Sequence, residues 1–257
     1  MKILVSNILA YEPFKKNYDA IEGLMRKSAR SDSELIFKYV DVYTVNTQYS
    51  YFEYYNSMRM IENIIKGEKE GCDAAIPYCY NDPYLQVIKQ AVNIPVIGLL
   101  GSSAFIAAMI SHKFAAIPPI DVYAPGMEQK LIEYGFRDKL IPNPVRALGG
   151  SEWMLTIVDD TKKAISRLKE ISKECIDDGA EAILPACGLL GSMCTIEGIT
   201  EIEGVPLVDG AVTALKMAEM LVDLKNSPLK LMTSRKALYK LATKEEMKEF
   251  RKAFGLT

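Results

Sequence analysis

Two cysteines with matching surroundings are the residues whose type and spacing best suit chemistry. Residues 70–79, "EGCDAAIPYC", align without a gap with residues 178–187, "DGAEAILPAC", and the segments end in Cys79 and Cys187. A single cysteine after an apolar run is often a small packing residue. Two cysteines at equivalent positions of an internal repeat instead favour a functional pair. Three further cysteines have no counterpart in the repeat and are expected to pack in the core: Cys72, Cys175 and Cys194.

Two opposed thiols support inversion at a carbon next to a carbonyl. A thiolate on one side removes a proton, and a thiol on the other side delivers a proton to the opposite face. A helix N-terminus close to such a cysteine favours the thiolate, and its free N–H groups can bind an enolate-like oxygen. This chemistry needs neither a metal nor a cofactor, and we expect none.

The residues after each cysteine suggest how helices could begin there. After Cys79 the sequence predicts a helix that is capped by Asn81 or Asp82 and has Pro83 at its first position. After the second cysteine, Gly188 would let the backbone approach a ligand closely. Both cysteines would then lie beside main-chain N–H groups.

Short apolar segments alternate with longer charged, amphipathic segments, which is typical of βαβ units around a parallel sheet. Strands are expected at residues 2–9, 34–45, 73–79, 94–100, 114–120, 181–187 and 205–210. Their nearly continuous hydrophobicity predicts sheets that are covered on both faces. In such sheets ligands bind beyond the carboxyl ends of the strands, which is where both cysteines are expected.

The repeat predicts an α/β fold with two pseudo-symmetric lobes, each a short parallel sheet flanked by helices, and a site in the cleft between them. The first lobe would comprise residues 1–100 and about 211–225, and the second residues 101–210. Residues 226–257 would form a C-terminal helical extension, in which Thr243 and Glu246 have the spacing of a capping box. This extension either packs on its own lobe or forms a subunit contact.

Three polar residues follow strands that match each other in the repeat. Asp209 closes the segment "VPLVD", and Ser102 and Ser103 follow the equivalent segment of the first lobe. Each could either cap the helix that comes next or contact a ligand.

The composition is that of an ordinary globular protein: 257 residues, 49% hydrophobic and 25% charged, with a net charge of -2. Basic clusters that would favour nucleic acid or an anionic membrane surface are missing, so we expect neither as a partner. A single histidine and the lack of a C-x-x-C pair disfavour a metal site. No secretion signal is recognisable at the N-terminus, so a cytoplasmic location is expected.

Three stretches carry a resemblance to a known family. They are "CYNDPYL" after an apolar strand, a second "CG" 108 residues later, and "VPLVDGAVTALKMAE" near the end. Over about residues 1–225 the chain resembles the aspartate/glutamate/hydantoin racemase superfamily, and most of all its hydantoin and allantoin racemases. The resemblance implies a cofactor-independent racemase or epimerase that forms a homo-oligomer, with Cys79 and Cys187 as the two acid/base residues.

The resemblance also implies which residues contact a small-molecule substrate. Main-chain contacts would come from Tyr80 and Asn81 after the first cysteine, and from Gly188 and Leu189 after the second. The first strand ends in "SNILAYEP", which retains Asn7 where relatives have an Asn-Pro-Asn-like turn that meets the substrate.

The substrate is expected to be a hydantoin-like cyclic ureide. Alternatives within the superfamily are racemisation of aspartate or glutamate, or isomerisation of a small dicarboxylate with one cysteine as nucleophile. A decarboxylase is disfavoured because that branch keeps only one of the paired cysteines. A further alternative is a non-enzymatic two-lobed protein that binds a small molecule without using the thiols.

Overall fold

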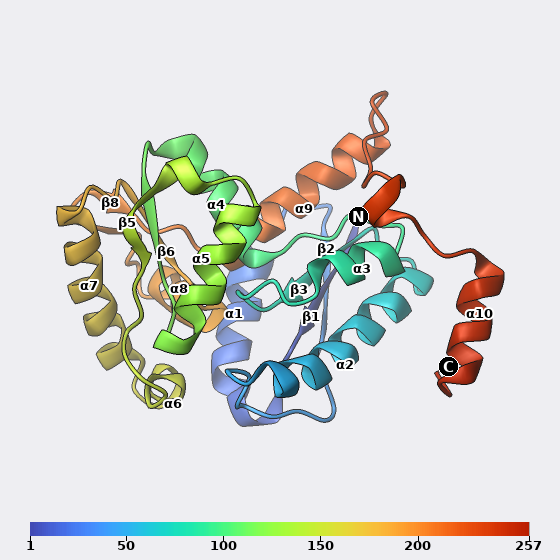
Figure 1. Ribbon diagram of the computed structural model, residues 1–257, viewed down its shortest axis with the longest axis horizontal. Helices are drawn as coiled ribbons and strands as arrows, with labels where there is room; N and C mark the ends of the chain where they lie inside the picture. The colour runs from blue at the N-terminus through green and yellow to red at the C-terminus, as the bar shows by residue number, and fades with distance from the viewer. Residues whose placement is uncertain (257) are drawn as a thin grey trace.

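Two parallel sheets of three strands form the framework of the protein, whose computed structural model describes residues 1–256. They lie side by side with helices around them (Figure 1). The first sheet has the order β2-β1-β3, with β1 (Lys2–Asn7), β2 (Glu34–Lys38) and β3 (Ala74–Tyr78). The second has the order β5-β4-β6, with β4 (Phe114–Ile117), β5 (Leu140–Val145) and β6 (Ala182–Pro185). The predicted α/β fold is confirmed.

The internal repeat occupies equivalent places in the two sheets. In each sheet the strand that precedes a cysteine, β3 or β6, pairs in parallel with the central strand. The second matched segment of each repeat lies on the outer side of that strand, where Val96 pairs with Ala75 and Leu207 pairs with Ile183. The two halves therefore share one topology, and each cysteine directly follows an equivalent strand.

Ten helices of the described chain surround the sheets. They are α1 (Lys15–Ser28), α2 (Ser50–Lys69), α3 (Leu85–Ala91), α4 (Leu99–Ile110), α5 (Ala124–Glu133), α6 (Trp153–Asp159), α7 (Thr161–Asp177), α8 (Gly188–Ile196), α9 (Gly210–Asn226) and α10 (Lys244–Ala253). Helix α2 packs against the first sheet, α7 against the second, and α4 contacts strands of both. None of the helices within residues 1–256 has the length and apolar character that crossing a membrane requires.

Alternating residues of each strand belong to different hydrophobic cores. In β1, Ile3 and Val5 enter the same core as Phe114 and Leu184 of the second sheet. Leu4, between them, faces the other side of the sheet and lies in a separate core beneath α2. Since successive side chains of a strand point to opposite faces, each sheet shares one face with its neighbour and covers the other with its own helices.

Several local expectations from the sequence are wrong. The strand expected at 94–100 is only an isolated bridge at Val96 before α4, and the strand expected at 205–210 ends at Pro206. The second strand ends at Lys38 instead of residue 45, and a loop leads from there to α2. The helix after Cys79 begins at Leu85, with Tyr84 in the left-handed conformation before it. Strand β5, which contains Pro142 and Pro144, was missing from the expected strands. It lies at the edge of its sheet, where a missing N–H is tolerated.

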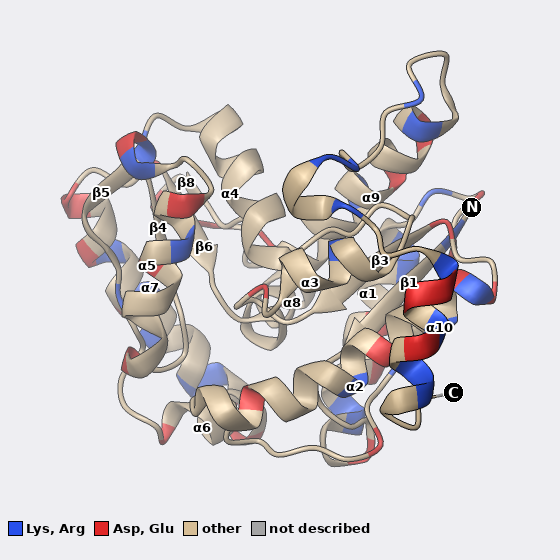
Figure 2. Ribbon diagram, turned by 45° about the vertical axis from the view of Figure 1, so that its right-hand side comes forward, with Lys and Arg blue, Asp and Glu red and all other residues tan. Residues whose placement is uncertain are grey.

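The C-terminal segment docks on the outside of the first half. The predicted capping box of Thr243 and Glu246 is present at the start of α10. Arg251 of α10 forms a bidentate ion pair with Glu62 of α2, with nitrogen–oxygen distances of 2.8 and 3.1 Å. Acidic and basic residues alternate along α10 (Figure 2). The segment thus contacts its own chain, whereas a subunit contact of this segment, the proposed lobe boundaries and the homo-oligomer remain predictions.

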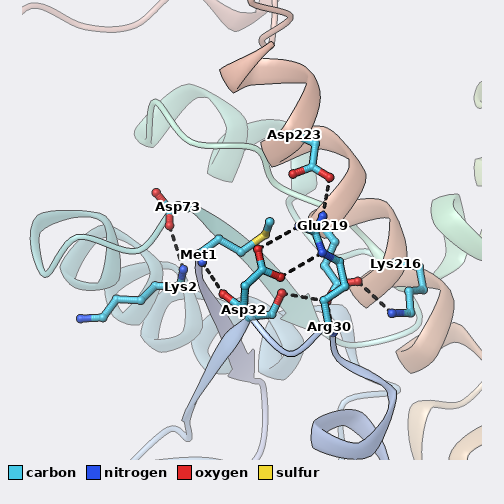
Figure 3. A network of polar contacts seen from close by, with 9 residues as sticks. Met1, Lys2, Arg30, Asp32, Asp73, Lys216, Glu219 and Asp223 are labelled. Carbon is cyan, nitrogen blue, oxygen red and sulfur yellow. Dashed lines mark hydrogen bonds and ion pairs between the residues drawn. The ribbon is translucent and has the colours of Figure 1, made fainter.

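Hydrogen bonds and ion pairs connect α9 to the turn that follows α1 (Figure 3). The buried carboxylate of Glu219 accepts hydrogen bonds from the Arg30 N–H at 2.8 Å and the Ser33 hydroxyl at 2.9 Å, and pairs with Lys216 at 2.9 Å. The Arg30 guanidinium in turn contacts Asp223 of α9. Burial alone would raise the pKa of Glu219, but these donors hold it below its ordinary value.

This network predicts a specific acid dependence of stability. At pH 7 Glu219→Gln is expected to lower the free energy of unfolding by about 1–2 kcal/mol, because the charged acceptor of these donors is lost. Folding lowers the pKa of Glu219, so its contribution exists above the ordinary glutamate pKa of about 4.3 and disappears as the pH falls through the folded value. Urea titrations of the wild type and of Glu219→Gln at pH 7 and pH 3.5 measure the difference in their free energies of unfolding.

The control is Asp223→Asn, which removes an exposed carboxylate from the same network and should cost less than about 1 kcal/mol. A stability difference between wild type and Glu219→Gln that stays constant from pH 7 to pH 3.5 would contradict the prediction.

Candidate active site

Both repeat cysteines line one open cavity of about 90 Å³. Cys79 reaches it from the residue after β3, and Cys187 from two residues after β6. Each side chain is half-buried and free of a disulfide. The three cysteines without a repeat partner are buried elsewhere, as expected. The structure therefore brings together the two thiols that the sequence repeat singles out.

Cys187 is the N-cap residue of α8. The free N–H groups of the first turn give this end of a helix a partial positive charge. Burial raises the pKa of the Cys187 thiol, and the main-chain groups of Leu190 and Leu189 oppose that rise. Although the sequence signal for a helix was weaker here than after Cys79, this is the cysteine that a helix N-terminus directly follows.

Cys79 lies before a turn that is fixed by a buried carboxylate. The Asp82 N–H donates to the Cys79 carbonyl at 3.1 Å. The Asp82 side chain accepts hydrogen bonds from the N–H groups of Leu100 and Gly101, at 3.1 and 2.9 Å, and from the Tyr134 hydroxyl at 3.0 Å. Asp82 thus caps α4, from outside that helix, and neither Asn81 nor Asp82 caps the helix that follows Cys79.

Charged groups from two other helices reach the turn after Cys79. Glu53 in the first turn of α2 accepts a hydrogen bond from the Asn81 side chain at 3.0 Å. The Lys130 ammonium of α5 donates to the carbonyls of Asn81 and Asp82. Burial raises the pKa of the Cys79 thiol, the Glu53 carboxylate raises it further, and the main chain at Asn81 opposes both.

A chain of hydrogen bonds connects the first sheet to α8 and α9. The Tyr78 hydroxyl at the end of β3 donates to the Gly188 carbonyl at 3.1 Å and lies 3.4 Å from the Ser192 hydroxyl. Asp209 caps α9 through the Ala211 N–H at 2.8 Å, so its capping role is confirmed. Asp209 also accepts a 2.8 Å hydrogen bond from Thr195 of α8.

Gly188 must be a glycine for this connection to form. A Cβ added there would lie 2.8 Å from the Tyr78 ring, closer than real Cβ contacts allow. The glycine after the second cysteine therefore serves close packing between the two halves as well as any ligand contact.

Four of the six expected contact residues line the cavity: Tyr80, Asn81, Gly188 and Leu189. Asn7 does not, although Ile8 and Leu9 directly after it do. The Asn7 side chain is buried at the end of β1, and its Oδ1 has no hydrogen-bond partner among residues 1–256. Ser102 is buried in α4, donates to the Leu99 carbonyl at 3.1 Å, and lies outside the cavity lining.

Several lining residues were not expected from the sequence. Tyr18 comes from α1, Thr47 from the loop before α2, Tyr123 from the 3₁₀ helix η2 (Asp121–Tyr123), and Met154 from α6. The hydroxyls of Thr47 and Tyr123 lie 2.9 Å apart and join segments of the two halves beside the thiols. Tyr18, Tyr123 and Met154 lie outside the repeat and belong to no motif, so no sequence signal marked them, whereas Thr47 begins a tyrosine-rich stretch, residues 47–60, that could have indicated pocket lining.

The cavity that holds the thiols is uncharged. Among the described residues that line it, none is Asp, Glu, Lys, Arg or His. Helix α8, whose first two residues line the cavity, carries no charged residue along its length (Figure 2). Four tyrosines line the cavity and supply hydroxyl groups and aromatic faces: Tyr18, Tyr78, Tyr80 and Tyr123.

Comparison with known proteins identifies the family. The model of the Asp/Glu/Hydantoin racemase family matches residues 18–218, most of the chain. The chain belongs to this family. A hydantoin racemase from Pseudomonas sp. (strain NS671) is 29% identical over 227 residues, which cover 88% of this chain and 87% of that protein. A hydantoin racemase from Rhizobium meliloti is 33% identical over 164 residues, 63% of this chain and 66% of that protein.

Solved structures confirm the fold. Allantoin racemase from Klebsiella pneumoniae superposes with a TM-score of 0.83 at 22% identity. The match covers 95% of this chain and 94% of the allantoin racemase chain. Allantoin racemase AllR from Pseudomonas fluorescens gives a TM-score of 0.81 at 23% identity, covering 94% and 97%. The resemblance to the hydantoin and allantoin branch is confirmed, and so is the prediction of a racemase, which is a type of isomerase.

Proposed function

We propose that this racemase inverts a carbon next to a carbonyl, without a cofactor, by using Cys79 and Cys187 as opposed acid and base. The observation that carries the proposal is the placement of both repeat cysteines on one uncharged cavity. They arrive from equivalent strand ends of two sheets with the same topology, so a ligand in the cavity would have one thiol contributed by each half.

In the proposed reaction one thiolate removes the proton from the carbon. The electron pair of the broken carbon–hydrogen bond moves onto the neighbouring carbonyl and forms an enolate. The other thiol delivers its proton to the opposite face, and the roles reverse for the mirror-image substrate. In this proposal the N–H groups at the start of α8 would stabilise the negative oxygen.

The substrate we propose is a neutral cyclic ureide, such as a 5-substituted hydantoin. Aspartate and glutamate carry two carboxylates and an ammonium group, and none of the described lining residues has a charged side chain that could pair with them. A hydantoin presents only ring amides and carbonyls, and its flanking carbonyls acidify the proton that must be removed. The curated relatives are named hydantoin racemases, which agrees with this choice.

The test is a screen in deuterium oxide. Single enantiomers of 5-substituted hydantoins, allantoin, aspartate and glutamate are incubated with the protein, and the proton on the reacting carbon is followed by NMR while polarimetry follows inversion. We expect deuterium entry together with loss of optical rotation for at least one cyclic ureide and for neither amino acid. Exchange of aspartate or glutamate alone would replace the proposed substrate class. Binding without exchange of any compound would favour the non-enzymatic binding protein.

A further inference from the structure

We propose that Tyr78 and Lys130 are positioning residues that fix the separation of the two thiols. Each comes from one half of the molecule and donates a hydrogen bond to the turn that follows the cysteine of the other half. The inference rests on the proposed two-thiol function for its meaning, because inversion requires both sulfurs at a set spacing on opposite faces of one carbon. One of its two tests needs no substrate.

The first of these hydrogen bonds directly joins the neighbours of the two cysteines. Tyr78 ends β3 of the first sheet and precedes Cys79, whereas Gly188 begins α8 of the second half and follows Cys187. The Tyr78 hydroxyl donates to the Gly188 carbonyl at 3.1 Å. Its ring is buried and leaves no room for a Cβ on Gly188. The first turn of α8 therefore has a fixed place relative to the end of β3, and one peptide bond separates this contact from each cysteine.

The second connection runs in the converse direction. Lys130 belongs to α5, which packs against β5 of the second sheet. Its ammonium donates to the carbonyls of Asn81 and Asp82, which lie two and three residues after Cys79. The Tyr134 hydroxyl, directly after α5, donates to the Asp82 side chain at 3.0 Å. The turn after Cys79 is thus held by donors of the second half.

The internal repeat does not contain this pair of connections. In its second copy the position of Tyr78 is occupied by Ala186, whose side chain has no donor. Lys130 lies on a helix outside both copies. The two halves therefore share a topology but are joined by different groups, a phenol from one side and an ammonium from the other. A movement of the halves that changed the spacing of the thiols would have to lengthen at least one of these hydrogen bonds.

Both donors act on main-chain carbonyls close to the cysteines. A carbonyl oxygen has two lone pairs, so the Gly188 carbonyl can accept from Tyr78 while it also accepts within α8. Misplacement of reacting groups by about 1 Å can lower a rate roughly 10²-fold. Inversion needs both thiols in place, whereas exchange of a proton on one face needs only one of them. Loss of either donor should therefore damage inversion more than exchange.

Tyr78→Phe and Lys130→Met test this role in the full-length protein, because each removes the donor and keeps a side chain of nearly the same size. With a substrate that the deuterium screen has confirmed, we expect each to lower kcat for inversion by roughly ten- to 100-fold and to change KM by less than about threefold. The ratio of deuterium exchange to inversion should rise by at least about threefold. NMR and polarimetry measure the two rates on the same samples.

Matched controls separate positioning from folding. Tyr54→Phe and Lys162→Met make the same substitutions at exposed residues outside the cavity lining and should leave both rates unchanged. Lys130→Arg retains a cationic donor and should recover at least about half of the wild-type kcat. Rates are expressed per folded molecule, with the folded fraction taken from urea unfolding. A merely structural role would lower that fraction and leave the ratio of exchange to inversion unchanged.

The spacing of the thiols can be compared without substrate. Bifunctional methanethiosulfonates with spacers of graded length react with Cys79 and Cys187, while the other cysteines are buried. Each thiolate displaces a sulfinate from one end of the reagent and forms a disulfide, so no further oxidant is required. Mass spectrometry of the peptides identifies the spacers that join the two cysteines. We expect one spacer length to predominate in the wild type, and neighbouring lengths to react as well in Tyr78→Phe and Lys130→Met.

An unchanged distribution of spacers in both folded variants overturns the proposal, and so does a wild-type distribution without a preferred length. A change in only one variant removes the other residue from its role. An unchanged ratio of exchange to inversion in both variants contradicts the proposal as well. Failure of the proposed function is distinct, because the wild type then exchanges no compound in the deuterium screen while the distributions of spacers are still measured.

Discussion

Cys79→Ser and Cys187→Ser are each expected to lower the rate of inversion by roughly 10² to 10⁴-fold, the range that general acid–base groups contribute. A serine hydroxyl has nearly the size of the thiol but almost never ionises near neutral pH, so it cannot act as the base. It is also a poor acid for an enolate. Because each thiol serves one face of the carbon, losing either one interrupts inversion in both directions.

The two variants should differ in proton exchange. Cys79→Ser retains a base at Cys187, so it is expected to exchange the proton of one enantiomer with solvent without inverting it. Cys187→Ser should do the same with the other enantiomer. NMR in deuterium oxide measures exchange, and polarimetry measures inversion on the same samples.

The matched control is Cys72→Ala, which removes a buried thiol of the first half that lies outside the cavity lining. Its activity per folded molecule should match the wild type. If both single serine variants invert a confirmed substrate at the wild-type rate, the two-base assignment is wrong.

The largest effect on stability is expected at Asp82. Asp82→Ala should lower the free energy of unfolding by about 3–5 kcal/mol, because the buried N–H group of Leu100 and the partly buried Gly101 N–H and Tyr134 hydroxyl all lose their acceptor. The Asp82 carboxyl also packs closely against Gly98, where an added Cβ would lie 2.3 Å from it. Equilibrium unfolding in urea measures the loss.

Two comparisons separate capping from other effects of the change. Asp82→Asn keeps one acceptor oxygen but turns an amide NH₂ toward a donor, so a loss of about 2 kcal/mol is expected, between wild type and alanine. Asp138→Ala removes an exposed carboxylate and should change stability by less than about 0.5 kcal/mol. A loss at Asp82→Ala no larger than at Asp138→Ala would show that the buried cap is dispensable.

Features that depend on neighbours in the chain could be predicted well. The alternation of apolar and amphipathic segments predicts parallel sheets, and the repeat predicts equivalent strands that end in Cys79 and Cys187. The capping box of Thr243 and the helix cap of Asp209 also follow from residues that are adjacent or nearly so. Hydrogen bonds within one turn of chain leave a pattern that can be read directly.

Features that depend on distant segments could not be predicted in this way. Asp82 has the spacing to cap the helix after Cys79, yet its carboxylate finds α4, because the chain folds back over the turn. Strand β5 contains two prolines, and only its place at a sheet edge makes them acceptable. Tyr18, Thr47 and Met154 enter the cavity from segments that share no motif.

The sequence by itself determined that two thiols end two equivalent parallel strands, because strand patterns, the repeat and the position of a cysteine within it are properties of contiguous residues. Only the tertiary structure decided that one thiol is followed by a helix N-terminus and the other lies beside the turn that holds Glu53. The reason is that Glu53 of α2 and Lys130 of α5 reach only the turn after Cys79. The second copy of the repeat contains no equivalent of these two charged residues.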